Sequence, residues 1–74
     1  MEITIYTLDK IPTVIITDEY DLVDVVLIKY SEITGIEKEN ANLIYNGKYL
    51  DKTKTIGFYG VKNNDNMHII IKKY

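Results

Sequence analysis

The sequence has no cysteine and no tryptophan, and it has only one proline and one histidine. Without cysteine the chain can form neither a disulfide nor a thiolate metal site, so its core must be stable without such cross-links. Its longest apolar run, Val25 to Ile28, is far shorter than the roughly 20 residues needed to span a bilayer. No charged and apolar signal segment follows Met1. We therefore expect no targeting peptide and no membrane partner.

What the chain does contain is enough apolar material for one small core. Hydrophobic residues make up 46% of its 74 residues, and the formal net charge is −2. A chain of this size buries about 60 to 65% of its unfolded surface, which suffices for a single compact core. We therefore expect one domain over residues 1–74. The nine basic residues are scattered rather than clustered, so we expect no nucleic-acid partner.

Alternating residues and turn signals predict several short strands. Ile3 and Ile5 alternate with polar neighbours, and a turn near Asp9 and Lys10 leads into a second strand. The single proline, Pro12, stands at the entrance of that second strand, which suits an edge strand. Asn46 and Gly47 give a strong hairpin signal. The strands predicted after the first are residues 13–17, 42–45, 48–49 and 66–72.

Between the second and third predicted strands the pattern favours a helix. Asp21 and Asp24 resemble a capping box, and Gly35 is a natural residue for the left-handed position after a helix. A spacing of 3.6 residues per turn gives one apolar stripe, formed by Val23, Val26, Leu27, Tyr30 and Ile33. The β-branched residues of this segment leave a strand as the competing interpretation. With the helix, the fold class is α+β, a β-grasp in which a mixed sheet packs on one helix.

Strand alternation predicts an apolar patch on the sheet face that the helix leaves open. The helix-covered face would carry Ile3, Ile5, Leu43, Tyr45, Met67, Ile69 and Ile71. Ile44, His68 and Ile70 must then point to the opposite face and toward water. Apolar side chains that converge from separate strands form a surface that monomers usually reserve for a partner. The alternatives are that a neighbouring loop covers them or that the register is shifted by one residue.

The residues from Leu43 to Leu50, together with Met67 to Ile71, resemble the ubiquitin family. The resemblance covers the whole chain. The apolar patch by which ubiquitin is bound corresponds here to Leu8, Ile44, His68 and Ile70, with Gly47 and Lys48 matching beside it. The resemblance implies a protein-binding module that docks non-covalently on ubiquitin receptors or on ubiquitin-pathway enzymes.

Other positions carry the resemblance less completely. A second, smaller patch has counterparts in Ile36 and Ile71, although its leucine near the tail is Lys73 here. Of the ubiquitin lysines that accept further ubiquitin, only Lys29 and Lys48 stand at matching positions. Tyr59 resembles the tyrosine whose hydroxyl holds the preceding loop, although plain core packing is an equal alternative for it.

Two departures from the family also bear on function. The sequence ends at Tyr74 without the glycine pair that the family uses for activation, so as written we expect no conjugation. Lys10 stands where ubiquitin has glycine, and lysine pays a steric cost at positive φ.

We expect no enzymatic activity, cofactor or metal site, because the only histidine, His68, has no cysteine, second histidine or suitably spaced acid to work with. We expect a monomer in the cytoplasm, with the nucleus or a host cell's cytosol left open.

Two alternative functions remain. The chain could be a domain of a longer protein, or a precursor or modifier whose tail has been trimmed. It could also be a structural or assembly component that uses the fold without the ubiquitin surface. Self-association through Val25, Ile28 and Phe58 would identify that second alternative.

Overall fold

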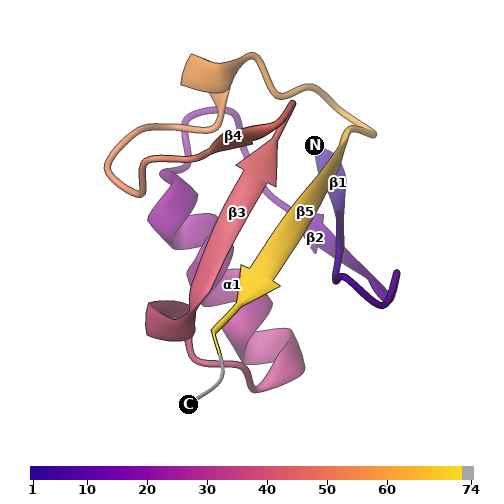
Figure 1. Ribbon diagram of the computed structural model, residues 1–74. Coiled ribbons are helices and arrows are strands. Elements are labelled where there is room, and N and C mark those ends of the chain that lie inside the picture. The colour runs from indigo at the N-terminus through magenta and orange to yellow at the C-terminus, as the bar shows by residue number, and fades with distance from the viewer. Residues whose placement is uncertain (73–74) are drawn as a thin grey trace.

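The computed structural model describes residues 1–72 as a five-stranded sheet with one α-helix lying across one of its faces (Figure 1). This arrangement confirms the predicted α+β β-grasp fold, with the helix and not the competing strand. In that part of the chain no helix has the length and apolar character that crossing a membrane requires. The elements in chain order are β1 (Glu2–Tyr6), β2 (Pro12–Ile16), α1 (Val23–Thr34), the 3-10 helix η1 (Lys38–Asn40), β3 (Ala41–Tyr45), β4 (Lys48–Tyr49), the 3-10 helix η2 (Gly57–Tyr59) and β5 (Asn66–Ile71).

The sheet has the strand order β2-β1-β5-β3-β4, which places the last strand in the middle. β5 runs parallel to β1 and antiparallel to β3, and the remaining pairs are antiparallel. In Figure 1, β3 and β5 cross in front of α1, so the face turned toward the viewer is the one that the helix does not cover. β2 and β4 form the two edges.

The core lies between α1 and the sheet, and strand alternation and the helical period together predicted most of it. Its buried members are Ile3, Ile5, Ile15, Val23, Val26, Leu27, Tyr30, Ala41, Leu43, Leu50, Ile56, Val61, Met67 and Ile69. Tyr45 and Ile71 are half-buried and pack against it. Ile33 was wrongly placed in the buried stripe, because its side chain is 61% exposed. It lies beside the edge strand β2, where no further strand of the described chain covers it.

The start of α1 differs from the predicted capping box. The helix begins at Val23, Leu22 is its N-cap residue, and no side chain caps it. Backbone carbonyls of the loop after β4 cap the helix instead. The Val23 N–H donates to the Lys54 carbonyl at 2.8 Å, and the Asp24 N–H donates to the Lys52 carbonyl at 3.2 Å. The first N–H groups of a helix need partners of this kind. A distant segment of chain therefore fixes where the helix starts.

The helix end and the turns follow their local sequence signals closely. Gly35 has φ 77°, and its N–H donates to the Ser31 carbonyl at 2.8 Å, as predicted for a residue after a helix. Asn46 and Gly47 both have positive φ, 51° and 77°, which confirms the hairpin turn. Lys10 takes φ 63° in the first turn, so lysine does occupy the left-handed region there. The strand limits differ from the predicted ones by a single residue at several ends.

Candidate functional site

The sheet face opposite α1 brings together the four residues predicted to form an apolar patch, here called the sheet patch: Leu8, Ile44, His68 and Ile70. In the β3–β5 register Ile44 lies opposite His68, and Ile70 lies opposite Asn42. Their neighbours Leu43 and Ile69 are buried against the helix, so the register is the predicted one. His68 is exposed, whereas Ile44 and Ile70 are half-buried rather than fully turned to water. Side chains of adjacent strands on one face shield each other in this way.

Leu8 reaches the patch from the turn between β1 and β2. Its side chain is 78% exposed. The turn is closed by two backbone hydrogen bonds, from the Thr7 N–H to the Ile11 carbonyl at 3.1 Å and from the Lys10 N–H to the Thr7 carbonyl at 2.9 Å. The Ile11 N–H also donates to the Thr7 hydroxyl at 3.1 Å. A shallow hollow of about 360 Å³ lies beside this turn, lined by Tyr6, Thr7, Leu8, Lys10, Asn66 and His68. Leu8 and His68 therefore border one concave surface.

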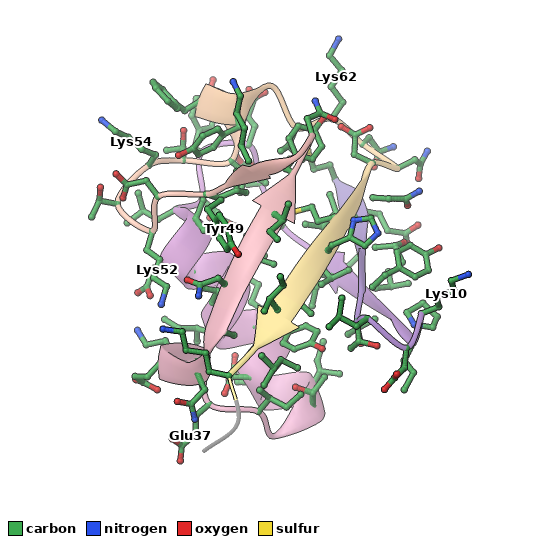
Figure 2. All side chains as sticks on the ribbon, in the orientation of Figure 1. Lys10, Glu37, Tyr49, Lys52, Lys54 and Lys62 are labelled. Carbon is green, nitrogen blue, oxygen red and sulfur yellow. The ribbon has the colours of Figure 1, made fainter. Side chains whose placement is uncertain are left out.

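Two tyrosines extend the sheet patch beyond the four residues predicted from the sequence. Tyr6 lies opposite His68 in the parallel β1–β5 register, and their ring centroids are 6.3 Å apart. Tyr49 lies opposite Ile44 and is 66% exposed, and Figure 2 shows it beside β3. Strand alternation could have found Tyr6, because it shares the parity of Glu2 and Thr4 on β1. Tyr49 could be placed only once the hairpin register was known.

Gly47 and Lys48 border the patch at the hairpin between β3 and β4. Both are exposed. Lys48 lies opposite Tyr45 rather than Ile44, one step along the hairpin from the patch. These two residues are therefore neighbours of the apolar surface and not its centre.

The second, smaller patch is only partly available for contacts. Ile36 and Ile71 are both half-buried and pack against the core. Ile71 lies opposite the buried Ala41 in the β3–β5 register. Lys73, the departure from the family at this patch, lies outside the described residues, as does Tyr74.

The two candidate modification lysines differ in their surroundings. The Lys29 Nζ donates to the Ile16 carbonyl at 3.0 Å and to the Asp21 carboxylate at 3.2 Å. Lys48 is exposed and forms no ion pair within residues 1–72. Of the two amines, Lys48 is the more open to a reaction partner.

Asp21 joins β2 to α1 through several hydrogen bonds that the capping interpretation had missed. Its Oδ2 accepts from the Thr17 hydroxyl at 2.7 Å and from the Asp18 N–H at 3.0 Å, besides Lys29. These donors, with the Thr17 hydroxyl foremost, lower the pKa of the Asp21 carboxyl from 3.8 to about 2. The charged carboxylate therefore stabilises the connection that carries the chain from the sheet into the helix.

Tyr45 and Asp65 form a second link between distant segments. The Tyr45 hydroxyl donates to Asp65 Oδ2 at 2.6 Å, and the Lys62 N–H donates to the same oxygen at 2.8 Å. The hydrogen bond from Tyr45, followed by that from Lys62, lowers the pKa of Asp65, and the same bond to Asp65 raises the pKa of Tyr45. The link holds the loop before β5 onto β3.

Tyr59 plays the loop-holding role that the family resemblance implied. Its hydroxyl accepts a hydrogen bond from the Asp51 N–H at 2.8 Å. Its neighbour Phe58 is 66% exposed, with the Lys54 Nζ lying 5.2 Å from the centre of its ring. Ile28, which was named with Val25 and Phe58 as a possible route of self-association, is 40% exposed.

Within residues 1–72 no three histidine, cysteine, aspartate or glutamate side chains gather as they would around a metal ion. A comparison with protein-family models gives a match to the model described as the ubiquitin family, over residues 3–74. The match covers nearly the whole chain, including every residue of the sheet patch.

Proposed function

Because this chain belongs to the ubiquitin family, we propose that it is a non-covalent protein-binding module that docks on ubiquitin receptors or ubiquitin-pathway enzymes through the sheet patch. Domains of this family are in general non-enzymatic modifiers. The observation that carries the proposal is the meeting of Leu8, Ile44, His68 and Ile70 on the sheet face that α1 leaves uncovered.

The chemistry of the patch suits an apolar partner surface such as one face of a helix. Ile44 and Ile70 supply aliphatic surface. Tyr49 adds an exposed aromatic ring at one side of the patch, and Leu8 adds an exposed aliphatic side chain at the other. His68 gives a polar group within the apolar area. We expect the buried area of such an interface to lie near the lower end of the range for protein complexes, where complexes are transient. We therefore expect weak binding with fast exchange.

The test is a titration of the isotopically labelled chain with a ubiquitin-binding helical domain, followed by amide chemical shifts. We expect shifts centred on Leu8, Ile44, Lys48, His68 and Ile70. Ile44→Ala should weaken the binding at least tenfold while the rest of the spectrum stays that of the folded domain. Ile28→Ala is the matched control, because it makes the same change on a partly exposed isoleucine of the helix.

Two results would count against the proposal. One is the absence of shifts at millimolar concentrations of the helical domain. The other is equal weakening by Ile44→Ala and Ile28→Ala, which would mean that the substitutions act through the fold and not through the patch.

A further inference from the structure

The edge strand β2 presents backbone groups that have no strand beside them. β2 pairs only with β1 in the described part of the chain. Met1 and Thr17 exchange two hydrogen bonds, of 2.7 and 2.9 Å, at one end of that pair. Because hydrogen-bonded pairs alternate along an antiparallel ladder, Pro12, Val14 and Ile16 direct their backbone groups away from β1. These three residues form the open edge of the sheet.

The open edge has an unusual set of donors and acceptors. Pro12 has no N–H to offer. The Ile16 carbonyl is already occupied, because the Lys29 Nζ donates to it at 3.0 Å. The Val14 N–H, the Val14 carbonyl, the Ile16 N–H and the Pro12 carbonyl remain, and no hydrogen bond within residues 1–72 uses them. The edge therefore offers two donors and two acceptors.

We propose that a second copy of this chain pairs with this edge, β2 against β2, in an antiparallel register centred on Val14. In that register the two Val14 residues exchange two hydrogen bonds, and each Ile16 N–H donates to the Pro12 carbonyl of the other copy. The donor that Pro12 lacks falls opposite the Ile16 carbonyl that Lys29 already occupies. All four open groups of each copy are then satisfied, with none left unpaired.

The side chains around the edge favour the same contact. Val14 is 51% exposed, Ile16 65% and Ile33 61%. In the proposed register Val14 meets Val14, and Ile16 meets Pro12, on the outer face of the sheet. On the helix side a groove of about 390 Å³ runs between β2 and α1, lined by Val14, Ile15, Ile16, Lys29, Glu32 and Ile33. Exposed apolar residues on both sides of an open edge strand are typical of surfaces that pair with another chain.

Charge does not oppose the contact. The groove carries one basic residue, Lys29, and one acidic residue, Glu32, and the whole chain has a formal net charge of only −2. The contact is nevertheless small, one strand and one helix side from each copy, and falls below about 1,200 Å² of buried surface. We therefore expect a weak dimer, monomeric at micromolar concentrations and paired at millimolar concentrations.

This inference goes beyond the proposed function and uses different residues. The strands β1 and β5 separate β2 from β3, which carries Ile44. Ile44→Ala should therefore leave dimer formation unchanged, and failure of one proposal does not bring down the other.

The experiment is a dilution series of the labelled chain from about 2 mM to about 20 µM, a range that brackets weak association. Translational diffusion and amide shifts are followed in each sample. In addition, a sample that mixes labelled and unlabelled chain is searched for magnetisation transfer between copies at Val14. Val14→Lys places two like charges at the centre of the contact. Ile28→Lys is the matched control on the helix.

We expect slower diffusion at high concentration, amide shifts confined to Val14, Ile16 and Ile33, and magnetisation transfer between the two Val14 residues. Val14→Lys should raise the dissociation constant at least tenfold, and Ile28→Lys should not change it. Diffusion that does not depend on concentration overturns the proposal. Dimerisation lost with Ile28→Lys and kept with Val14→Lys also overturns it, because the copies would then meet through the helix side. Edge shifts that appear only with an added extended peptide would assign the edge to a peptide instead.

Discussion

Replacing Asp21 with asparagine tests whether one charged hydrogen-bonded group stabilises the passage from β2 into α1. Asparagine keeps an oxygen that can accept from the Thr17 hydroxyl and the Asp18 N–H, but it removes the negative charge. A carboxyl whose pKa falls from 3.8 to about 2 on folding contributes at most about 2.5 kcal/mol at neutral pH. Because 29% of the side chain is exposed, solvent screening lowers this figure, and we expect a loss of about 1 to 1.5 kcal/mol.

The pH dependence of this loss has a definite sign. The pKa of Asp21 is lower in the folded state than in the unfolded one, so its contribution is fully present well above pH 3.8 and is lost as the pH falls through 3.8 toward about 2. The difference in the free energy of unfolding between the original chain and Asp21→Asn should therefore be constant from pH 7 to about pH 5. Below that it should shrink toward zero.

Urea unfolding followed by circular dichroism, repeated at several pH values, measures this difference. Asp9→Asn is the matched control, because Asp9 is exposed in the first turn and takes part in no hydrogen bond within residues 1–72. It should change the free energy of unfolding by less than about 0.5 kcal/mol at any pH. A difference for Asp21→Asn that persists at pH 2, or that is absent at pH 7, would refute the assigned role of its charge.

Three further substitutions test other contacts. Tyr59→Phe removes the acceptor of the Asp51 N–H and should lower the free energy of unfolding by about 1 kcal/mol, with faster hydrogen exchange at the Asp51 amide; unchanged exchange would contradict this. Tyr45→Phe should raise the pKa of the Asp65 carboxyl toward its ordinary value in an NMR titration, since the hydrogen bond from the Tyr45 hydroxyl is the main cause of the low pKa. An Asp65 pKa that does not change would argue against that cause. Lys10→Gly should raise the free energy of unfolding by about 0.5 to 1 kcal/mol in thermal melts, because glycine adopts φ 63° without strain; a lower melting temperature would show that lysine is not strained there.

The parts of the fold that follow from the sequence are those set by local chemistry and strand alternation. Positive φ could be predicted at Gly35, Asn46 and Gly47, because few residues other than glycine and asparagine adopt it readily. The structure has positive φ at all three positions. Leu43, Met67 and Ile69 are buried because alternation puts them on one face. The meeting of Ile44 with His68 followed from the same alternation once two strands were aligned.

The parts that could not be predicted depend on contacts between segments far apart in the chain. The sequence near Asp21 suggested a cap, but the first N–H groups of α1 bond to carbonyls of Lys52 and Lys54. Ile33 fits the apolar period of the helix, yet its exposure is decided by where the sheet ends. Period alone reports which side of a helix a residue occupies, and not whether anything lies opposite that side.

The central place of β5 in the sheet has a consequence for how the domain acquires its structure. Within residues 1–72, β1 and β3 share no hydrogen bonds with each other, and β5 joins the two hairpins into one sheet. The pairing of β1 with β5 closes a loop of nearly the whole domain, and such long closures slow folding. During synthesis on the ribosome, the sheet cannot be completed until residues 66–71 have left the exit tunnel. Folding of this domain can therefore be completed only after β5 has been synthesised.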